Sequence, residues 1–385
     1  MAQAESNRVD IRISAETTWN ETPTTPTMAS LPYTSESLAY EKRTVKSNIV
    51  RADRATDDLI EVGAGSSGDI NFEYKFGDFE LLIAAALGNS TFATATFTGT
   101  SNLSFAASGG GVQVLTAPAA TWNSFVVGTY VRVSGANAQN NGVWLVTAKD
   151  STTLTVKNTA GTTQASTSAT VAMKYARTST TKKSFLVEKN FGDITQFISF
   201  RGMRVGTWGM NIEAEQIVTG SFGLVGAGAF GAGTTVSGSV TPAGSLSVAS
   251  ATANVGRLQE AGADLATKVK AVRFNVNANP RQLTAVANKY PIGINLGSFE
   301  ITGTVEAYFE DLVLYNEFVN HTSSSLVVEV VSPESDNTII TFPKIKYSNA
   351  APVGAGLNQD VMVTMDFTAI YDSTLGTMMQ VDLLT

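Results

Sequence analysis

The sequence contains no cysteine and a single histidine, His321, among its 385 residues. The chain therefore has no disulfide framework, no cysteine nucleophile and no cysteine-based metal site. One histidine also excludes most zinc sites and serine-type catalytic triads unless it lies at their centre. We expect no cofactor and no metal, and we interpret His321 as a cap or surface residue at a helix end.

Long apolar runs and an excess of positive charge are also missing. The longest uninterrupted apolar run, 81–87, is far shorter than the roughly 20 residues of a membrane helix. The N-terminus lacks the pattern of a secretory signal. A net charge of −7 and a pI near 4.9 argue against tight binding to nucleic-acid phosphates. The sequence therefore predicts neither membrane association nor specific binding of DNA.

The residues that are abundant favour a mainly β protein. Hydrophobic residues make up 43% of the chain and charged residues 15%, an ordinary balance for a globular protein. Thr, Ser, Val, Ala and Gly are frequent, and short alternating segments lie between clusters of turn residues. We therefore expect many strands and few helices.

The stretch 66–87 changes its hydrophobic period halfway along. Polar and apolar residues alternate over 69–76, which predicts a strand with one solvated face. Asp78 then provides a helix N-cap, the apolar run 79–87 predicts a short buried helix, and Gly88 a left-handed stop. The pattern therefore predicts a strand, a tight turn and a helix.

The same order of signals recurs later in the chain. At an offset of 231 residues, 66–87 aligns with 297–318, so that Asp69 meets Glu300 and 81–83 meets 312–314. A second pair, 209–218 and 360–370, aligns at an offset of 151. The two offsets differ by 80 residues, about the length of the nearly uncharged block 94–173. This arithmetic predicts a duplicated unit whose first copy received an insert.

The predicted organisation is two tandem β units, each with a short flanking helix, and one inserted small β-domain. The first unit is discontinuous, and an exposed Gly-rich and Ser-rich linker separates the copies. The predicted ranges are 1–93 with 174–226 for the first unit, 94–173 for the insert, 227–250 for the linker and 251–385 for the second unit.

Four predicted strands share a polar face at matched places in both copies. Any one of them is explained as an ordinary solvated sheet face, but their recurrence indicates a common, mostly acidic surface. The members of this surface are Asp69, Asn71, Glu73, Lys75, Asn211, Glu213, Glu215, Glu300, Thr302, Thr304, Glu306, Asp360, Thr364 and Asp366.

A run of charged residues lies between the first prolines and the strand predicted over 69–76. It is interpreted either as a solvated loop or as an arm whose basic and acidic patches meet on neighbouring subunits. The residues of the predicted arm are Lys42, Arg43, Lys46, Arg51, Arg54, Asp57 and Asp58.

Two motifs that suggest chemistry have simpler explanations. The sequence 226–231, GAGAFG, satisfies the spacing of a dinucleotide loop, but no helix-forming residues follow it, so a flexible linker is the better interpretation. Glu213 and Glu215 resemble a glycosidase carboxylate pair, yet they alternate with apolar residues as one face of a strand. Neither motif requires an enzyme.

Three stretches, 35–87, 297–320 and 340–372, resemble the tail tube proteins of long, non-contractile-tailed bacteriophages. The resemblance lies in the order and spacing of a basic stretch, a strand with polar and apolar alternation, and an acidic helix start followed by Leu-Leu. It implies a β-sandwich-like unit flanked by one helix, with the inner strands of six units closing into a large barrel. Stacked rings would form a hollow channel for DNA ejection, and the chain would be a structural virion protein without enzymatic activity.

The resemblance also implies partners and a location. With two units per chain, three chains would make a ring, or six if the duplication is misread, and the insert would project outward. The tail tip, tape measure and tail completion proteins would be further partners, while DNA passes the lumen without specific binding and no membrane is contacted. The chain would be assembled in the host bacterial cytoplasm and reside in the tail tube of the virion.

Other classes remain as alternatives. A carbohydrate-binding or adhesive β-protein would use 94–173 as its binding module, with Trp122, Tyr130 or Trp144 as sugar platforms. An outer-membrane barrel is disfavoured by the missing signal and the irregular strand spacing. A glycosidase ranks last, because no carboxylate pair stands apart from the polar strand faces.

Overall fold

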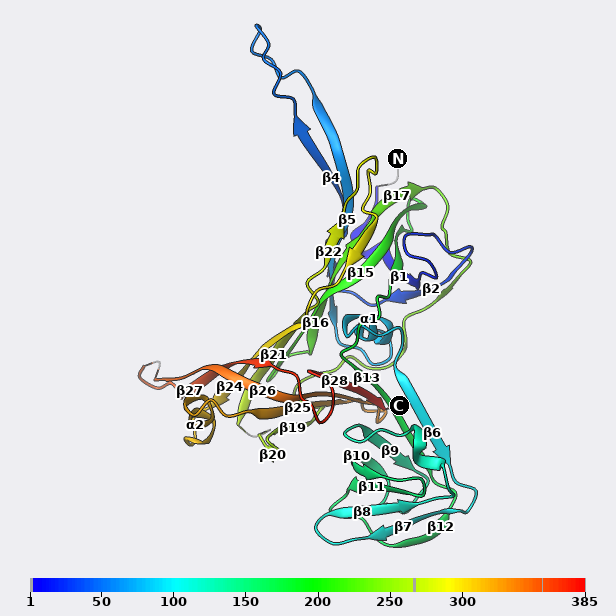
Figure 1. Cartoon of the computed structure of the whole chain (residues 1–385), viewed down its shortest axis with the longest axis vertical. Coiled ribbons are helices and arrows are strands. Elements are labelled where there is room, and N and C mark those ends of the chain that lie inside the picture. Colours follow the sequence, from blue (N-terminus) through cyan, green and yellow to red (C-terminus); the bar gives the residue numbers. More distant parts are fainter. Residues whose placement is uncertain (1–2, 266–267, 355, 385) are drawn as a thin grey trace.

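The computed structural model describes residues 3–265, 268–354 and 356–384, and it confirms a mainly β fold (Figure 1). Within these ranges there are two α-helices, α1 (Glu80–Ala86) and α2 (Val313–Val319), and two short 3₁₀ turns, Ser6–Arg8 and Thr121–Ser124. Everything else that is regular is strand. The prediction of many strands and few helices is therefore correct.

The strands fall into three groups along the chain. Those before the predicted insert are β1 (Val9–Ala15), β2 (Thr27–Leu31), β3 (Ser35–Glu36), β4 (Ala39–Lys46) and β5 (Leu59–Glu73). Those of the next group are β6 (Ala93–Thr98), β7 (Leu103–Ala107), β8 (Val112–Thr116), β9 (Tyr130–Ser134), β10 (Gly142–Lys149), β11 (Thr153–Lys157), β12 (Gln164–Thr167) and β13 (Thr170–Arg177).

The third group completes both copies of the repeat. Its first strands are β14 (Phe185–Phe191), β15 (Gln196–Glu213), β16 (Thr219–Gly226), β17 (Gly228–Ala232) and β18 (Ser239–Thr241). The remaining strands are β19 (Val255–Glu260), β20 (Ala263–Asp264), β21 (Val269–Asn277), β22 (Arg281–Leu283), β23 (Gly293–Asn295), β24 (Glu300–Tyr308), β25 (Ser324–Val331), β26 (Asn337–Val353), β27 (Met362–Ala369) and β28 (Gln380–Leu384).

Eight strands form one antiparallel sheet that runs through both halves of the chain, which we call the wall sheet. Its order is β4–β5–β16–β15–β21–β24–β27–β26. Before the start of β4, the short strand β3 continues the edge along β5. The junction between the halves is the β15–β21 pair, so the two halves share one continuous sheet.

The two halves repeat the same strand connections. In the first half, β15 pairs with β14 and β17 at its start and with β16 at its end. In the second half, β26 pairs with β25 and β28 at its start and with β27 at its end. The strand before each helix keeps its register, since Asn71 faces Ser221 on β16 and Thr302 faces Thr368 on β27.

One of the two predicted alignments is wrong. The offset of 231 matches β5 with β24, although α2 begins two residues later than this offset predicts from α1. The offset of 151 matches the end of β15 with β27, whereas the pairing makes β16 the counterpart of β27. Both segments alternate polar and apolar residues, and this pattern cannot distinguish neighbouring strands of one sheet.

The apolar side of the wall sheet packs against α1. Phe72 on β5 lies 4.2 Å from Phe79 and 5.0 Å from Phe222 between ring centroids, and Trp208 packs beside Phe222. All four rings are almost fully buried. Large aromatic side chains contribute strongly to a core of this kind, because each buries a large apolar area.

The turn into α1 differs in one detail from the prediction. Asp78 does not cap the helix; its Oδ1 accepts a hydrogen bond from the Gly244 N–H at 2.7 Å, across the chain. Gly88 does end the helix, with φ of 72° and its N–H donating to the Ala85 carbonyl. A Cβ at Gly88 would lie 2.3 Å from the Ser179 carbonyl oxygen, so glycine is required there.

Residues 93–177 form a second β structure with its own core, built around Trp122, Phe105 and Val171 (lower right in Figure 1). Its strand order is β6–β13–β9–β10–β11–β8–β7–β12. The chain enters and leaves through neighbouring strands, since Ala93 faces Tyr175 in the β6–β13 pair. We call this structure the insert.

The segment 227–250 is more ordered than a simple exposed linker. Strand β17 pairs with the first part of β15, and β18 pairs in parallel with β2. The linker prediction therefore misses two strands, because their Gly-rich and Ser-rich sequences carry little hydrophobic alternation.

Candidate functional site

A continuous polar surface covers one side of the wall sheet, and we call it the wall face. Cross-strand register aligns one row of it across seven strands. The members of that row are Asn71, Ser221, Gly209, Asn275, Thr302, Thr368 and Lys346. The next row is Glu73, Thr219, Asn211, Arg273, Thr304, Asp366 and Asn349. Strands from both halves of the chain thus contribute to one surface.

Most of the predicted surface residues lie on this face. They come from β5, β15, β24 and β27, and alternate with core residues along each strand. The residues concerned are Asp69, Asn71, Glu73, Asn211, Glu213, Glu300, Thr302, Thr304, Glu306, Thr364 and Asp366.

Three predicted residues lie elsewhere. Lys75 follows the end of β5, and its Nζ donates to the carbonyl of Gly244. Glu215 lies in the turn after β15 with φ of 62°, and Asp360 lies in the loop before β27. In each case the alternation in sequence continues beyond the residue at which the strand ends.

Arg273 lies in the middle of the wall face and was missed by the sequence analysis. Its Nη2 is 2.8 Å from Glu213 Oε2, its Nε donates to Asn211 Oδ1 at 2.9 Å, and its Nη1 is 3.7 Å from Glu306. The hydrogen bond from Arg273 lowers the pKa of Glu213. The face therefore carries more carboxylates than cations, but it is not uniformly acidic. The alternation of Arg273, Asn275 and Asn277 with apolar residues was the available signal.

The wall sheet has an unpaired strand at each edge. Along β26, residues 346–353 pair only with β27 on one side. At the other edge, β4 pairs only with β5. Among the described residues, no backbone group pairs with the outer side of either segment. Unpaired edges of this length are ready to add a strand from another chain.

The residues of the predicted arm lie on a long hairpin of β4 and β5, which projects beyond the rest of the molecule (top of Figure 1). We call this hairpin the arm, and its contact with a neighbouring subunit stays a prediction. Its base is braced by the β22–β23 hairpin: Lys289 Nζ lies 2.9 Å from Glu61, and Arg43 donates to Gln282. At the tip, Arg51 pairs with Asp53 at 2.9 Å and Asp57 at 3.0 Å. Part of the predicted charge pairing is thus satisfied within the arm itself.

The other predicted arm residues are exposed and have fewer partners. Asp58 accepts a hydrogen bond from the Leu59 N–H. Lys42, Lys46 and Arg54 form no ion pair with any carboxylate of the described chain. These cations are therefore available to a partner.

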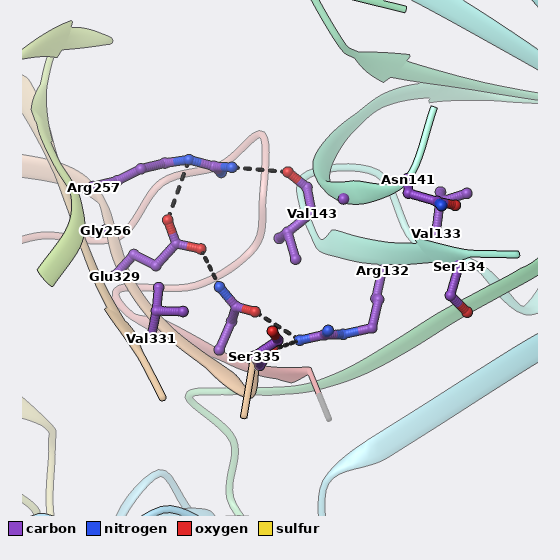
Figure 2. A pocket seen from close by; sticks show the side chains of 12 residues that line it. Arg132, Val133, Ser134, Asn141, Val143, Gly256, Arg257, Glu329, Val331 and Ser335 are labelled. Atoms are coloured by element: carbon purple, nitrogen blue, oxygen red, sulfur yellow. Dashed lines mark hydrogen bonds and ion pairs between the residues drawn. The ribbon is translucent and has the colours of Figure 1, made fainter. Parts of the chain in front are cut away.

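The insert is fixed to the second half of the chain by a chain of polar contacts, drawn in Figure 2. Arg257 contacts Glu329 at 3.3 Å, Glu329 accepts from Asn337 at 2.8 Å, and Asn337 accepts from Arg132 at 2.7 Å. Arg132 also donates to the Leu384 carbonyl. The adjoining open cleft has a volume of about 590 Å³. Arg132 of the insert donates to the second half, and Arg257 of the second half donates to the Val143 carbonyl of the insert. These contacts therefore position the insert.

Two acidic groups in the second half of the chain have raised pKa values: the buried Asp382 and the half-buried Glu317. Burial raises the pKa of Asp382 to about 7, although Gln380 and the Tyr130 N–H both donate to its carboxyl. Burial and the neighbouring carboxylate of Glu260 raise the pKa of Glu317, on α2, to about 8. Both groups therefore favour the protonated form in the folded state.

The remaining candidates have structural explanations. His321 follows α2 with φ of 51°, and its N–H donates to the Phe318 carbonyl, so it is a helix-end residue as interpreted. The GAGAFG segment forms the end of β16 and most of β17, without a following helix. Trp122 and Tyr130 are buried, and the Trp144 indole donates to the Asn140 carbonyl. Two of the three proposed sugar platforms are therefore inaccessible.

Two other kinds of site are absent from the described ranges. No helix there has both the length and the apolar character needed to cross a membrane. In the same ranges, no group of three or more acidic or histidine side chains is arranged to hold a metal ion.

The fold and the wall face define a mainly β protein with one sheet surface lined by polar side chains from two repeated halves. Residues 6–369 match the family model described as phage tail tube protein, and the chain belongs to this family. A comparison with curated proteins found no match. Membership of this family implies a structural protein of the virion tail that assembles with itself and with other tail proteins.

Proposed function

We propose that this chain is the repeating subunit of a phage tail tube: chains join edge to edge into rings, and the rings stack into a hollow channel for DNA ejection. The observation that carries the proposal is the wall sheet, which combines one polar face with an unpaired strand at each edge. Closing such sheets into a barrel removes the exposed edges. The free side of 346–353 on one chain would pair with the β3–β4 edge of the next.

The repeat supports a ring of three chains. Each half supplies four strands to the wall sheet: β4, β5, β16 and β15 from the first, and β21, β24, β27 and β26 from the second. Three chains would thus provide six equivalent units around the ring, and a six-chain ring is the alternative. In this proposal the tube units are 1–93 with 174–226 and 251–385, and the insert projects from the outside.

The wall face would line the channel. Its excess of carboxylates would repel phosphate, so that DNA passes without specific binding. The chain would act without catalysis. The tape measure protein inside the tube, and the tail tip and tail completion proteins at its ends, would be its further partners.

Electron microscopy of the purified protein or of virions tests the ring directly. We expect hollow tubes whose end-on views have threefold symmetry with six similar wall units. A chain found only as a monomer, in solution and in virions, would refute the proposed function. End-on views with sixfold symmetry would instead replace three chains per ring by six.

A second experiment tests the channel. Four wall-face carboxylates are replaced by lysine: Asp69, Glu73, Glu300 and Asp366, none of which forms an ion pair with a described residue. We expect tubes to assemble and DNA ejection to slow, because lysines attract the passing phosphates. Reversing Glu21 and Glu334, which lie off the wall face, is the matched control. Ejection at the normal rate in the first variant would exclude the wall face from the channel.

A further inference from the structure

Large apolar side chains that are exposed in the single chain gather at the two ends of the wall strands. In a closed barrel these ends form the two rims of the ring. We call them the arm rim, with the arm and the β22–β23 hairpin, and the helix rim, with α1, α2 and the loop 356–361. Of the exposed large apolar residues in the described ranges, only Val127, Val240 and Tyr371 lie outside these rim elements and the turns and loops beside them.

At the arm rim, the distal part of the arm carries a contiguous exposed apolar patch. Patches of this kind mark sites of interaction with another molecule. Val50 is 95% exposed, and the neighbouring apolar side chains are all more than half exposed. Hydrogen bonds and ion pairs of residues 44–60 connect this part only to itself or to the adjoining arm strand. The arm tip patch consists of Val45, Ile49, Val50, Leu59, Ile60 and Val62.

At the helix rim, α2 has no buried residue. An apolar patch extends from α2 to the adjacent loop, and we call it the α2 patch. Its members are Tyr308, Leu312, Val313, Val319, Leu357 and Val361. A cavity of about 220 Å³ opens beside Val313 and Tyr315, with Leu265 and Phe309 on its other walls. This cavity is large enough for a branched side chain such as that of Ile49.

The two patches lie at opposite ends of the wall strands. Strand β24 lies four antiparallel steps from β5, so both strands run in the same direction. The arm tip lies at the start of β5 and α2 follows the end of β24, which places them on different rims. Figure 1 shows them far apart, so one chain cannot cover its own α2 patch with its own arm.

The charges around the two patches are complementary. Lys46 and Arg54 on the arm have no carboxylate partner in the described chain. Beside α2, Glu310 and Asp311 share the single cation Lys268, at 2.8 and 3.5 Å. Opposite charges that meet at an interface orient the encounter of two chains.

We propose that the arm tip of one chain docks on the α2 patch of a second copy in the adjacent ring, with an apolar side chain of the tip filling the cavity beside α2. Two different patches of the same chain form a head-to-tail contact, which propagates without closing. This contact would set the stacking of rings, whereas strand pairing would form each ring. The inference rests on the proposed ring-forming function.

Cysteine trapping tests the contact, since the chain has no cysteine of its own. Val50→Cys and Val313→Cys are made in separate chains, and the two proteins are mixed before assembly and treated with a mild oxidant. We expect a disulfide-linked dimer only in the mixture. Val50→Cys mixed with Val127→Cys, on the insert, is the matched control. Dimers in the control but not in the Val50 and Val313 mixture would overturn the proposal.

An assembly experiment separates this contact from the ring itself. Val50→Asp and Val313→Asp change exposed residues, so each chain should keep the thermal unfolding midpoint of the wild type. Each variant alone should form single rings, and their mixture should form paired rings, because each supplies the patch that the other lacks. Long tubes from either variant, or no pairs in the mixture, would refute the docking alone. Absence of rings in the wild type would refute the proposed function instead.

Discussion

The two helices occupy equivalent places in the repeat but have different surroundings. In α1, Leu82 is 1% exposed and the helix is covered by the chain's own segments. On α2, by contrast, Val313 is 60% exposed and no residue of the helix is buried. The two halves therefore share their strand connections but differ in how the helix is covered.

The difference has a visible cause in the connections. The chain leaves α1 into the insert and returns past it, so that Ser179 donates its N–H to the Leu87 carbonyl and Lys174 lies 2.6 Å from Glu80. No insert follows α2, which leads directly into β25. A helix that the chain itself does not cover is free to be covered by a neighbour.

Leu82→Ala and Val313→Ala should give the widest separation between the two helices. The first leaves a cavity in a packed core and should lower the free energy of unfolding by about 3 kcal/mol. The second removes methyl groups that are already in water and should change it by less than about 0.5 kcal/mol. Denaturant titration of the unassembled chain measures both. Equal losses would mean that α2 is buried in solution.

The helix ends provide a second matched pair. Gly88 and His321 both have positive φ, and each donates its N–H to the carbonyl three residues earlier. Gly88→Ala should destabilise the chain by about 2 kcal/mol, because it adds left-handed strain to a clash with Ser179. His321→Gly should stabilise it by at most about 1 kcal/mol, because only strain is relieved. Thermal unfolding compares the two, and changes of the same sign would contradict the equivalence of these positions.

The smallest expected effect is on the pH dependence of stability, through a titratable residue of α2 that has an apolar counterpart in α1. Counted from the first residue of each helix, Glu317 on α2 corresponds to the buried Ala84 on α1. Glu317 faces Glu260 on β19, to which Ser324 Oγ donates at 2.5 Å and the Tyr347 hydroxyl at 3.2 Å.

Because the folded-state pKa of Glu317 is raised to about 8, the folded chain binds its proton more tightly than the unfolded chain does. Its contribution to stability is present below about pH 4 and is lost as the pH rises towards 8. Glu317→Gln should therefore make the fall in stability over this range less steep, as measured by denaturant titration at several pH values. Asp382, with a pKa of about 7, should preserve part of the slope. Glu310→Gln is the control, and an identical slope in both variants would contradict this assignment.

The sequence predicted those features that depend on local pattern. The alternation around Asp69 located a wall strand, and Gly88 located a helix end, because both follow from the geometry of a few neighbouring residues. The recurrence of this pattern near Glu300 located a second strand that is followed by a helix.

The errors concern contacts between distant segments. Lys75 continues the alternation of its strand, but Gly244, far along the chain, draws it off the wall face. Asp78 has the position of a helix cap and bonds to the same distant loop. The central place of Arg273 depends on β15 pairing with β21, and no local signal specifies that pairing.

The adjacency of Ala93 and Tyr175, where the insert leaves and rejoins the first half, has a consequence for how such proteins diversify. Because these two positions already lie side by side, the entropic cost of closing the chain between them rises only slowly with the length of the inserted segment. The first half therefore has an insertion site at which a domain can be gained, exchanged or lost while the wall sheet keeps its register. In the proposed tube, exchange of the insert would change the outer surface and leave the wall face unaltered.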